Sequence, residues 1–411
     1  MYREDVRPSS QPASTKPTAL DQWRADTPGC GERIHLNNAG AALVTSAVAE
    51  AIAEHLALES RLGGYEAAET RTDRIRDAYA TLGRLVGGLP RNIAMAPSST
   101  IAFTQALSAF DLQPGDQILT TRNDYASQQI MFLSLSRRLG VEIVRADDLS
   151  EGGVDPDSVR RLVRRRRPRL VAVTWIPTNS GLVQPVEAIG EICESAAVPY
   201  LVDACQAVGQ IPIDVARVHC DYLAATARKF LRGPRGIGFL YVSDRVLDTG
   251  AYPLLVDMQG ANWTAPDAFE LAPDARRFET WELASALLLG MGAAARYALE
   301  VGIETARDRA RALAALARER LARLPGARVL DRGAELCAIV TVELAGADPT
   351  ELKLELRRRG INVSVSTRTA AVIDMDDKRA TAALRLSPHY YNTEDEVVRA
   401  VEVINSVNGE R

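Results

Sequence analysis

Short apolar runs alternate with helical patterns along most of this 411-residue chain, and this alternation constrains the fold more than any other feature. Apolar residues recur at helical spacing in residues 47–62, 72–86, 157–164 and 186–196. The strand-like runs are residues 118–120, 141–144, 170–173, 200–202 and 238–242. Compact apolar strands between helices are typical of a buried, largely parallel sheet with helices on both faces. The sequence therefore predicts an α/β fold.

The pattern changes after about residue 275, which indicates a second and smaller domain. A long helical zone rich in Ala, Leu and Arg covers residues 283–324. Two strand-like runs follow at residues 338–342 and 361–365, and a closing helix covers residues 394–407. We expect three parts: a flexible lead-in, a large α/β domain, and a linking helix with a smaller α+β domain, at residues 1–18, 19–275 and 276–411.

Composition argues against several classes of function. The net charge of −4 offers no basic field for nucleic acid or an anionic membrane. Five cysteines without CxxC spacing and four histidines without metal spacing indicate neither a disulfide framework nor a metal site. Neither an apolar run of about 18 residues nor a signal-peptide core is evident, so we expect a cytoplasmic enzyme.

Lysine is rare in this Arg-rich chain, and its positions are informative. Lys16 lies in a Ser- and Pro-rich stretch, and Lys353 and Lys378 sit among charges, where solvated lysines belong. Lys229 instead follows an apolar run and precedes a Gly-Pro-Arg-Gly turn. A lysine can lose its proton and attack a carbonyl to form a Schiff base, whereas an arginine cannot. Considered alone, Lys229 is best interpreted as a helix-end or loop lysine without a catalytic role. The motifs described next favour a catalytic role instead.

Polar residues follow several expected strands, at the edge where open α/β sheets bind ligands. The hydroxyl-rich residues 97–100 precede a helical pattern, so they could hold a phosphate at a helix start. Asp203 ends an apolar strand; such an Asp is often a simple cap, but Gln206 and Lys229 nearby favour a shared pocket. A carboxylate for a pyridine nitrogen, a phosphate cradle and a lysine together indicate pyridoxal phosphate (PLP), whose ring is an electron sink.

In the order and spacing of these motifs, the chain resembles a fold-type I PLP enzyme of the class V aminotransferase and cysteine desulfurase superfamily, from about Leu36 onward. The resemblance implies an aspartate-aminotransferase-like fold, with a mostly parallel sheet of the seven-stranded type in the large PLP-binding domain. It also implies a homodimer with active sites at the interface, acting on a small amino-acid substrate.

The resemblance further implies roles around the cofactor. Ser99, Thr100, Thr226 and Arg228 would bind the phosphate, and Tyr125 would stack on the ring. Thr178, Asn179 and Gln206 would lie near the phenolic oxygen. Asp203 would pair with the pyridine nitrogen, and Lys229 would form the Schiff base. Thr280, in Arg277-Phe278-Glu279-Thr280, matches the segment that reaches the phosphate of the neighbouring subunit.

On the substrate side, the resemblance implies roles for Asn38, Tyr65 and Arg385. Arg385 matches the arginine that clamps the substrate α-carboxylate through two parallel hydrogen bonds. Residues 63–69, which include Tyr65, have two interpretations: a helix C-cap that opens another helix, or a substrate-facing loop. This segment resembles one in C–S lyases of the ergothioneine and lincosamide pathways, which act on cysteine S-conjugates. The two interpretations need not exclude each other.

The chain departs from the desulfurases at the positions that handle sulfur. Desulfurases carry His before the Schiff-base lysine and commonly His on the ring, where this chain has Arg228 and Tyr125. They also carry a cysteine on a loop of the small domain that takes up sulfur as a persulfide. The corresponding residues 362–383 contain no cysteine, and Ser or Thr cannot replace a thiolate in this role.

Three hypotheses follow for the function. The first is a lyase that cleaves the Cβ–S bond of a cysteine S-conjugate to a thiol or sulfenate, pyruvate and ammonia, in sulfur-containing secondary metabolism. The second is transamination, or decarboxylation-coupled deamination, of a similar conjugate by the same residues. The third is a catalytically silent regulator, against which the intact Lys229, Asp203 and Arg385 argue. The sequence leaves the S-substituent open.

Overall fold

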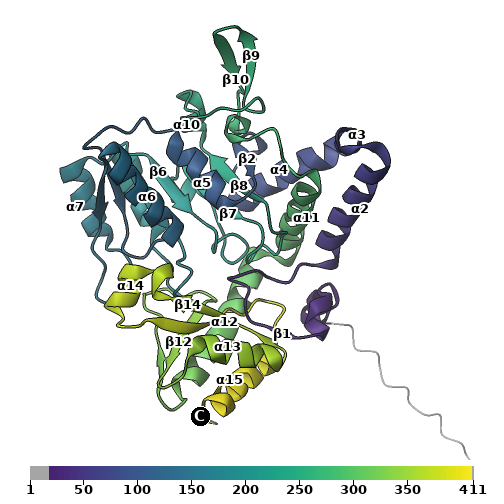
Figure 1. The fold of residues 1–411 in the computed structure, drawn as a ribbon, viewed down its shortest axis with the longest axis vertical. Coiled ribbons are helices and arrows are strands. Elements are labelled where there is room, and N and C mark those ends of the chain that lie inside the picture. The colour runs from purple at the N-terminus through teal and green to yellow at the C-terminus, as the bar shows by residue number, and fades with distance from the viewer. Residues whose placement is uncertain (1–17, 410–411) are drawn as a thin grey trace, which may run out of the picture.

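The computed structural model describes residues 18–409, so the lead-in expected at residues 1–18 lies outside them except for its last residue. A large α/β body lies beside a smaller group of strands and helices (Figure 1). The strands of the large sheet are β2 (Ile93–Ala96), β3 (Gln117–Thr120), β4 (Glu142–Arg145), β5 (Leu170–Thr174), β6 (Tyr200–Asp203), β7 (Tyr222–Thr226) and β8 (Gly238–Val242).

The large sheet has seven strands in the order β2-β8-β7-β6-β5-β3-β4. Strands β7, β6, β5, β3 and β4 pair in parallel, whereas β8 runs antiparallel to both of its neighbours. No helix lies between β7 and β8, and a parallel neighbour would need a helical crossover. The largely parallel sheet expected from the sequence is therefore confirmed, with one reversed strand.

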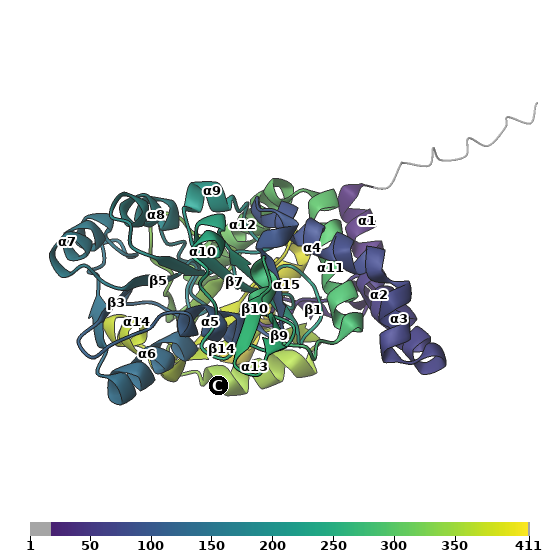
Figure 2. The ribbon, with the colours of Figure 1, turned by 90° about the horizontal axis from the view of Figure 1, so that it is seen from above.

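Helices cover both faces of this sheet. They are α4 (Thr72–Val86), α5 (Ser99–Ser108), α6 (Ala126–Leu139), α7 (Pro156–Arg166), α8 (Val186–Ser195), α9 (Val215–Val218) and α10 (Asp244–Asp248). Figure 2 places α5 and α6 on the opposite side of the sheet from α8 and α9. Successive strand residues serve the two faces: Tyr200 and Val202 join one apolar core and Leu201 joins the other. This double burial explains why the strands are continuous apolar runs.

Three helices precede α4: α1 (Ala19–Ala25), α2 (Ser46–Leu62) and α3 (Gly64–Thr70). Helix α2 ends at Gly63, whose φ of 99° favours glycine, and α3 begins at the next residue. The interpretation of this segment as a helix C-cap that opens another helix is thus confirmed.

The helical zone expected at residues 283–324 is two helices, α11 (Ser285–Val301) and α12 (Ile303–Ala322). They meet at Gly302, where φ is 83°, with a bend of 80°. Helix α11 packs against α2 and α4, whereas α12 packs against α15 (Glu394–Gly409). Within residues 18–409, no single helix is long and apolar enough to cross a membrane. Helices α11 and α12 meet these two criteria only when they are taken together as this bent pair.

A second sheet, four-stranded and antiparallel, has the order β11-β12-β15-β14. Its strands and accompanying helices are β11 (Ala327–Val329), β12 (Val340–Leu344), α13 (Pro349–Arg358), β14 (Ser364–Thr367), α14 (Val372–Asp377) and β15 (Ala382–Leu386). Strand β1 (Ile34–His35) pairs in parallel with β13 (Ile361–Asn362) and returns the amino-terminal chain to this region. A hairpin of β9 (Ala261–Ala265) and β10 (Ala268–Leu271) projects from the body (Figure 1). The exact domain boundaries stay a prediction.

Candidate active site

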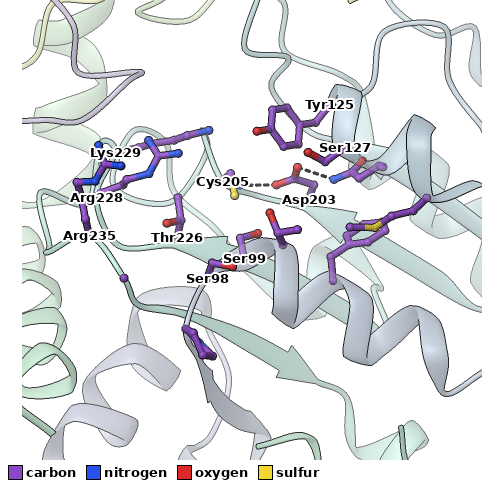
Figure 3. Close-up of a pocket in the computed structure, with 16 residues that line it drawn as sticks. Ser98, Ser99, Tyr125, Ser127, Asp203, Cys205, Thr226, Arg228, Lys229 and Arg235 are labelled. Atoms are coloured by element: carbon purple, nitrogen blue, oxygen red, sulfur yellow. Dashed lines mark hydrogen bonds between the residues drawn. The ribbon is translucent and has the colours of Figure 1, made fainter. Parts of the chain in front are cut away.

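A cavity of about 230 Å³ lies at the carboxyl ends of β2, β6 and β7. Its walls come from the loop into α5, the start of α6, the chain after β6 and the turn after β7 (Figure 3). Seven of the expected site residues line it: Ser99, Thr100, Tyr125, Asp203, Thr226, Arg228 and Lys229. They come from four separate segments that the parallel sheet brings together.

Lys229 lies just beyond β7 and is 6% exposed. Its Nζ lies 5.7 Å from the ring centre of Tyr125 and forms no hydrogen bond with the residues that the structure describes. Burial lowers the pKa of Lys229, and the positive charges of Arg228 and Arg385 act in the same direction, against Cys205 and Asp203. A buried amine with a lowered pKa carries a free electron pair more often, which suits a nucleophile or a general base.

Asp203 ends β6 with its carboxylate buried in the cavity wall. Gln128 Nε2 donates to Oδ2 at 2.5 Å, and the backbone N of Cys205 donates to Oδ1 at 2.8 Å. Thr174 Oγ1 donates to Gln128 Oε1 at 2.9 Å and so fixes the direction of the Gln128 amide. No described cation forms an ion pair with Asp203, so its charge is available to a protonated group in the cavity.

The first turn of α5 forms another part of the cavity wall. Ser98 caps the helix by accepting from the backbone N of Ile101, and Ser99 and Thr100 are the first helical residues. Their N–H groups have no partner within the helix, so this end favours an anion. Gly238 permits β8 to lie close to β7 and to the first turn of α5. A Cβ at this position would lie 2.4 Å from Ala225 O and 3.0 Å from Ser99 N.

Thr178 and the buried Gln206 and Arg385 form a hydrogen-bonded layer and do not line the cavity itself. Arg385 donates to Thr178 O at 2.9 Å and to Thr178 Oγ1 at 2.7 Å, and Gln206 Nε2 donates to the same Oγ1 at 3.1 Å. Burial and the nearby Arg228 lower the pKa of Arg385 to about 10. Arg385 Nε and Gln206 Oε1 are buried without a hydrogen-bond partner, and no described carboxylate pairs with Arg385. An anionic ligand would supply that missing partner.

Four expected site residues lie outside the cavity wall and this layer. Asn179 donates to Asp374 Oδ2 at 2.6 Å, and Asn38 Nδ2 donates to Ser387 O at 2.7 Å, so both amides already have partners. The neighbouring Asn37, rather than Asn38, contacts Arg385. Thr280 and Tyr65 line a surface groove of about 790 Å³ together with Trp281. Within one chain none of these four residues lines the cavity, and their assigned roles stay predictions.

Several residues of the cavity, including Gln128 and Arg235, were not among the residues predicted from the sequence. Gln128 follows Tyr125 by three residues at the start of α6, a helical spacing that could have indicated a shared face. Arg235 follows the Gly-Pro pair and lines the cavity with no described carboxylate as its partner. The expectation that Lys378 is solvated is wrong: it is 3% exposed and pairs with Asp374.

Comparison with known proteins places this geometry in context. A family model described as aminotransferase class-V matches residues 34–399. A probable hercynylcysteine sulfoxide lyase of Mycobacterium tuberculosis is 27% identical over 414 residues, covering 98% of this chain and 97% of the relative. A probable cysteine desulfurase of Methanothermobacter thermautotrophicus is 25% identical over 394 residues, covering 94% and 97%. The apo cysteine desulfurase structure of Thermococcus onnurineus has a TM-score of 0.87 at 22% identity, covering 97% and 100%, which confirms the expected fold class.

Proposed function

This chain belongs to the aminotransferase class-V family, and from that premise we propose that it is a PLP-dependent lyase that cleaves the Cβ–S bond of a cysteine S-conjugate. The expected products are a thiol or sulfenate, pyruvate and ammonia. Similarity over nearly the whole chain to a relative named as a hercynylcysteine sulfoxide lyase supports this choice. A relative named as a cysteine desulfurase is similar to a comparable degree, so the choice between the two rests on the site.

The cavity residues fit the cofactor that this family uses. The first turn of α5 suits its phosphate, and the unpaired carboxylate of Asp203 suits a protonated pyridine nitrogen. Lys229 offers an amine whose pKa is lowered by burial, as a link to the cofactor aldehyde requires. When bound, PLP supplies an electron sink beside the substrate α carbon.

The chain's own side chains supply the remaining parts of the reaction. Arg385 would bind the substrate α-carboxylate, because it is a buried guanidinium near Lys229 that has no carboxylate partner and whose Nε has no hydrogen-bond partner. Lys229, once free, would remove the α-proton as a neutral amine. The Cβ–S bond then breaks with its electron pair leaving on sulfur, and hydrolysis of the released enamine gives pyruvate and ammonia.

One observation carries the choice of a lyase over a desulfurase: among the described residues, the cavity offers a base but no reactive thiol. Cys205 is its only cysteine, and burial together with Asp203 raises the pKa of that thiol to about 12. A thiol with this pKa is a poor nucleophile at neutral pH. Residues 362–383, where desulfurases carry their cysteine, form β14 and α14 without any. Sulfur would therefore leave with the product rather than on the protein.

A panel of S-substituted cysteines tests this proposal. We expect equimolar pyruvate, ammonia and small thiol from the holoenzyme, because elimination releases all three from one substrate molecule. Enzymatic assays for each product, with carbon dioxide and keto acid measured in parallel, distinguish the alternatives. A keto acid that retains the sulfur would indicate transamination, and carbon dioxide would indicate decarboxylation-coupled deamination. A protein persulfide found by mass spectrometry would support the desulfurase instead.

A homodimer with active sites at its interface belongs to the same proposal. The groove that contains Thr280 exposes Tyr65 and Trp281, and the nearby hairpin exposes Trp263, which is 81% exposed. Large exposed aromatic side chains of this kind are typical of protein interfaces. If Thr280 contributes to the phosphate site of the second copy, then cofactor binding requires the dimer.

Substitution of Trp281 by Asp should therefore weaken the dimer and release the cofactor together. Loss of a central aromatic contact at an interface costs about 2 kcal/mol, which raises the dissociation constant roughly 30-fold. Sedimentation velocity, recorded at protein and cofactor wavelengths, measures both effects. Leu354→Asp, at an exposed apolar residue of α13, is the matched control. A monomer that retains PLP would contradict the shared site.

A cytoplasmic location and a place in sulfur-containing secondary metabolism complete the proposal. The location is the expectation drawn from the sequence pattern, and the place in metabolism rests on the resemblance to C–S lyases that act on cysteine S-conjugates. The substrate panel identifies which S-substituents the enzyme accepts.

A further inference from the structure

An ion pair at the end of helix α14 in the smaller region is joined, through Asn179, to the loop that follows β5. Lys378 Nζ lies 2.7 Å from Asp374 Oδ2, and Asn179 Nδ2 donates to the same oxygen at 2.6 Å. All three side chains are largely shielded from solvent, with Lys378 3% and Asn179 2% exposed. Shielding a charged pair from solvent carries a desolvation cost, which the ion pair and the hydrogen bond from Asn179 offset.

The loop that Asp374 anchors also carries a contact of the candidate carboxylate clamp. Thr178, next to Asn179, accepts two hydrogen bonds from Arg385 Nη1, through its carbonyl oxygen and its hydroxyl. Arg385 lies on β15, the strand that follows α14 in the chain. The smaller region thus contacts the same loop twice, once through Asp374 and once through Arg385.

This arrangement leaves Arg385 little freedom. Its Nε has no partner, its Nη1 donates two hydrogen bonds to Thr178, and its Nη2 donates one to Asn37 at 3.3 Å, so the position of the loop contributes to the orientation of the guanidinium. If the anchor at Asn179 were lost, the loop and the guanidinium could move together away from the geometry in which two parallel hydrogen bonds reach a carboxylate.

We propose that Asp374, supported by Lys378, is a positioning residue for substrate binding: through Asn179 and Thr178 it orients Arg385 toward the substrate α-carboxylate. The proposal rests on the proposed function, in which Arg385 binds that carboxylate. Asp374 itself touches neither substrate nor cofactor, so its effect is on affinity for carboxylates and not on the chemical step.

Replacement of the buried pair by apolar residues tests this role. Asp374→Ala combined with Lys378→Met removes the anchor without leaving a buried unpaired ammonium. Its matched control is Asp376→Ala with Arg368→Met, which removes an exposed ion pair of the same region. We expect the KM for S-methylcysteine to rise about tenfold in the buried-pair variant, since a hydrogen bond to a charged group is lost. The kcat and the control variant should change little.

Binding of a non-reacting carboxylate separates positioning from general destabilisation. 3-(Methylthio)propanoate has the carboxylate and thioether but no amine, and calorimetry on the holoenzymes should give the same tenfold loss of affinity. A merely structural pair would lower the melting temperature and leave this affinity unchanged. If the double variant does not fold, Asp374→Asn, which keeps an acceptor for Asn179, should give a smaller loss in the same direction.

A double-mutant cycle with Asn179→Ala decides whether Asp374 acts through Asn179. If it does, adding Asn179→Ala to the buried-pair variant raises the KM no further; independent contributions would multiply. Multiplying effects, or an unchanged affinity in the buried-pair variant, would overturn the proposal. If the unmodified holoenzyme eliminates thiol from no member of the panel of S-substituted cysteines and does not bind 3-(methylthio)propanoate, the proposed function fails instead.

Discussion

Replacement of Lys229 by Ala is expected to abolish both turnover and the visible absorption of the bound cofactor. No other described lysine lines the cavity, so nothing replaces its amine as the link to PLP or as the base for the α-proton. We expect a loss of at least roughly 10³-fold in turnover, as for removal of a general base that is also the covalent partner. Product assays and an absorption spectrum measure the two effects.

The same variant should not be less stable than the parent apoprotein. Lys229 is buried and its Nζ has no hydrogen-bond partner among the described residues, so its desolvation opposes folding. Thermal unfolding of the two apoproteins measures this difference. Lys353→Ala, a lysine on α13 outside the cavity, is the control and should retain full turnover. Full turnover by the Lys229 variant would remove this residue from the site.

Substitution of Asp203 by Asn is expected to slow removal of the α-proton by about a hundredfold or more while the protein still folds. The amide cannot stabilise a protonated pyridine nitrogen as a carboxylate does, so the cofactor becomes a weaker electron sink. Gln128 Nε2 and the backbone N of Cys205 each donate to a different oxygen of Asp203. The amide of Asn has only one oxygen, so one of these two donors would lose its acceptor.

Exchange of the substrate α-proton in deuterated water, followed by NMR, measures that step without requiring the later bond cleavage. Asp221→Asn is a useful comparison, because Asp221 is a buried carboxylate at the far end of β7 that accepts from Tyr200 N and pairs with Arg245. It should lower stability without a specific effect on exchange. Normal exchange in the Asp203 variant would exclude this residue as the partner of the ring nitrogen.

The fold could be predicted largely because the strands are buried on both faces. Continuous apolar runs such as that of β6 leave few alternatives to a covered parallel sheet. Strand direction, however, does not change the pattern of apolar residues, so the reversal of β8 could not be read from it. The break at Gly302 was missed for a similar reason, because a single glycine within a helical pattern is often tolerated.

The site could be predicted where residues lie at strand ends and could not be predicted where side chains meet across the fold. Lys229 and Asp203 follow apolar strands, a position with a known consequence in open sheets. Gln128 contacts Asp203 across 75 positions of sequence, and no local pattern indicates that contact. Lys378 has charged sequence neighbours typical of a solvated lysine, yet its pairing with Asp374 buries it. Whether Thr280 and Tyr65 belong to the site depends on a second copy of the chain.

The measurement that tests the central claim most directly is the location of the amine that holds the cofactor. Borohydride reduction of the holoenzyme, followed by digestion and mass spectrometry, fixes PLP to that amine and identifies its residue. We expect the label on Lys229 alone, because it is the buried lysine of the cavity and has no ion-pair partner. A label on Lys378 or Lys353 would contradict the account, since neither residue lines this cavity.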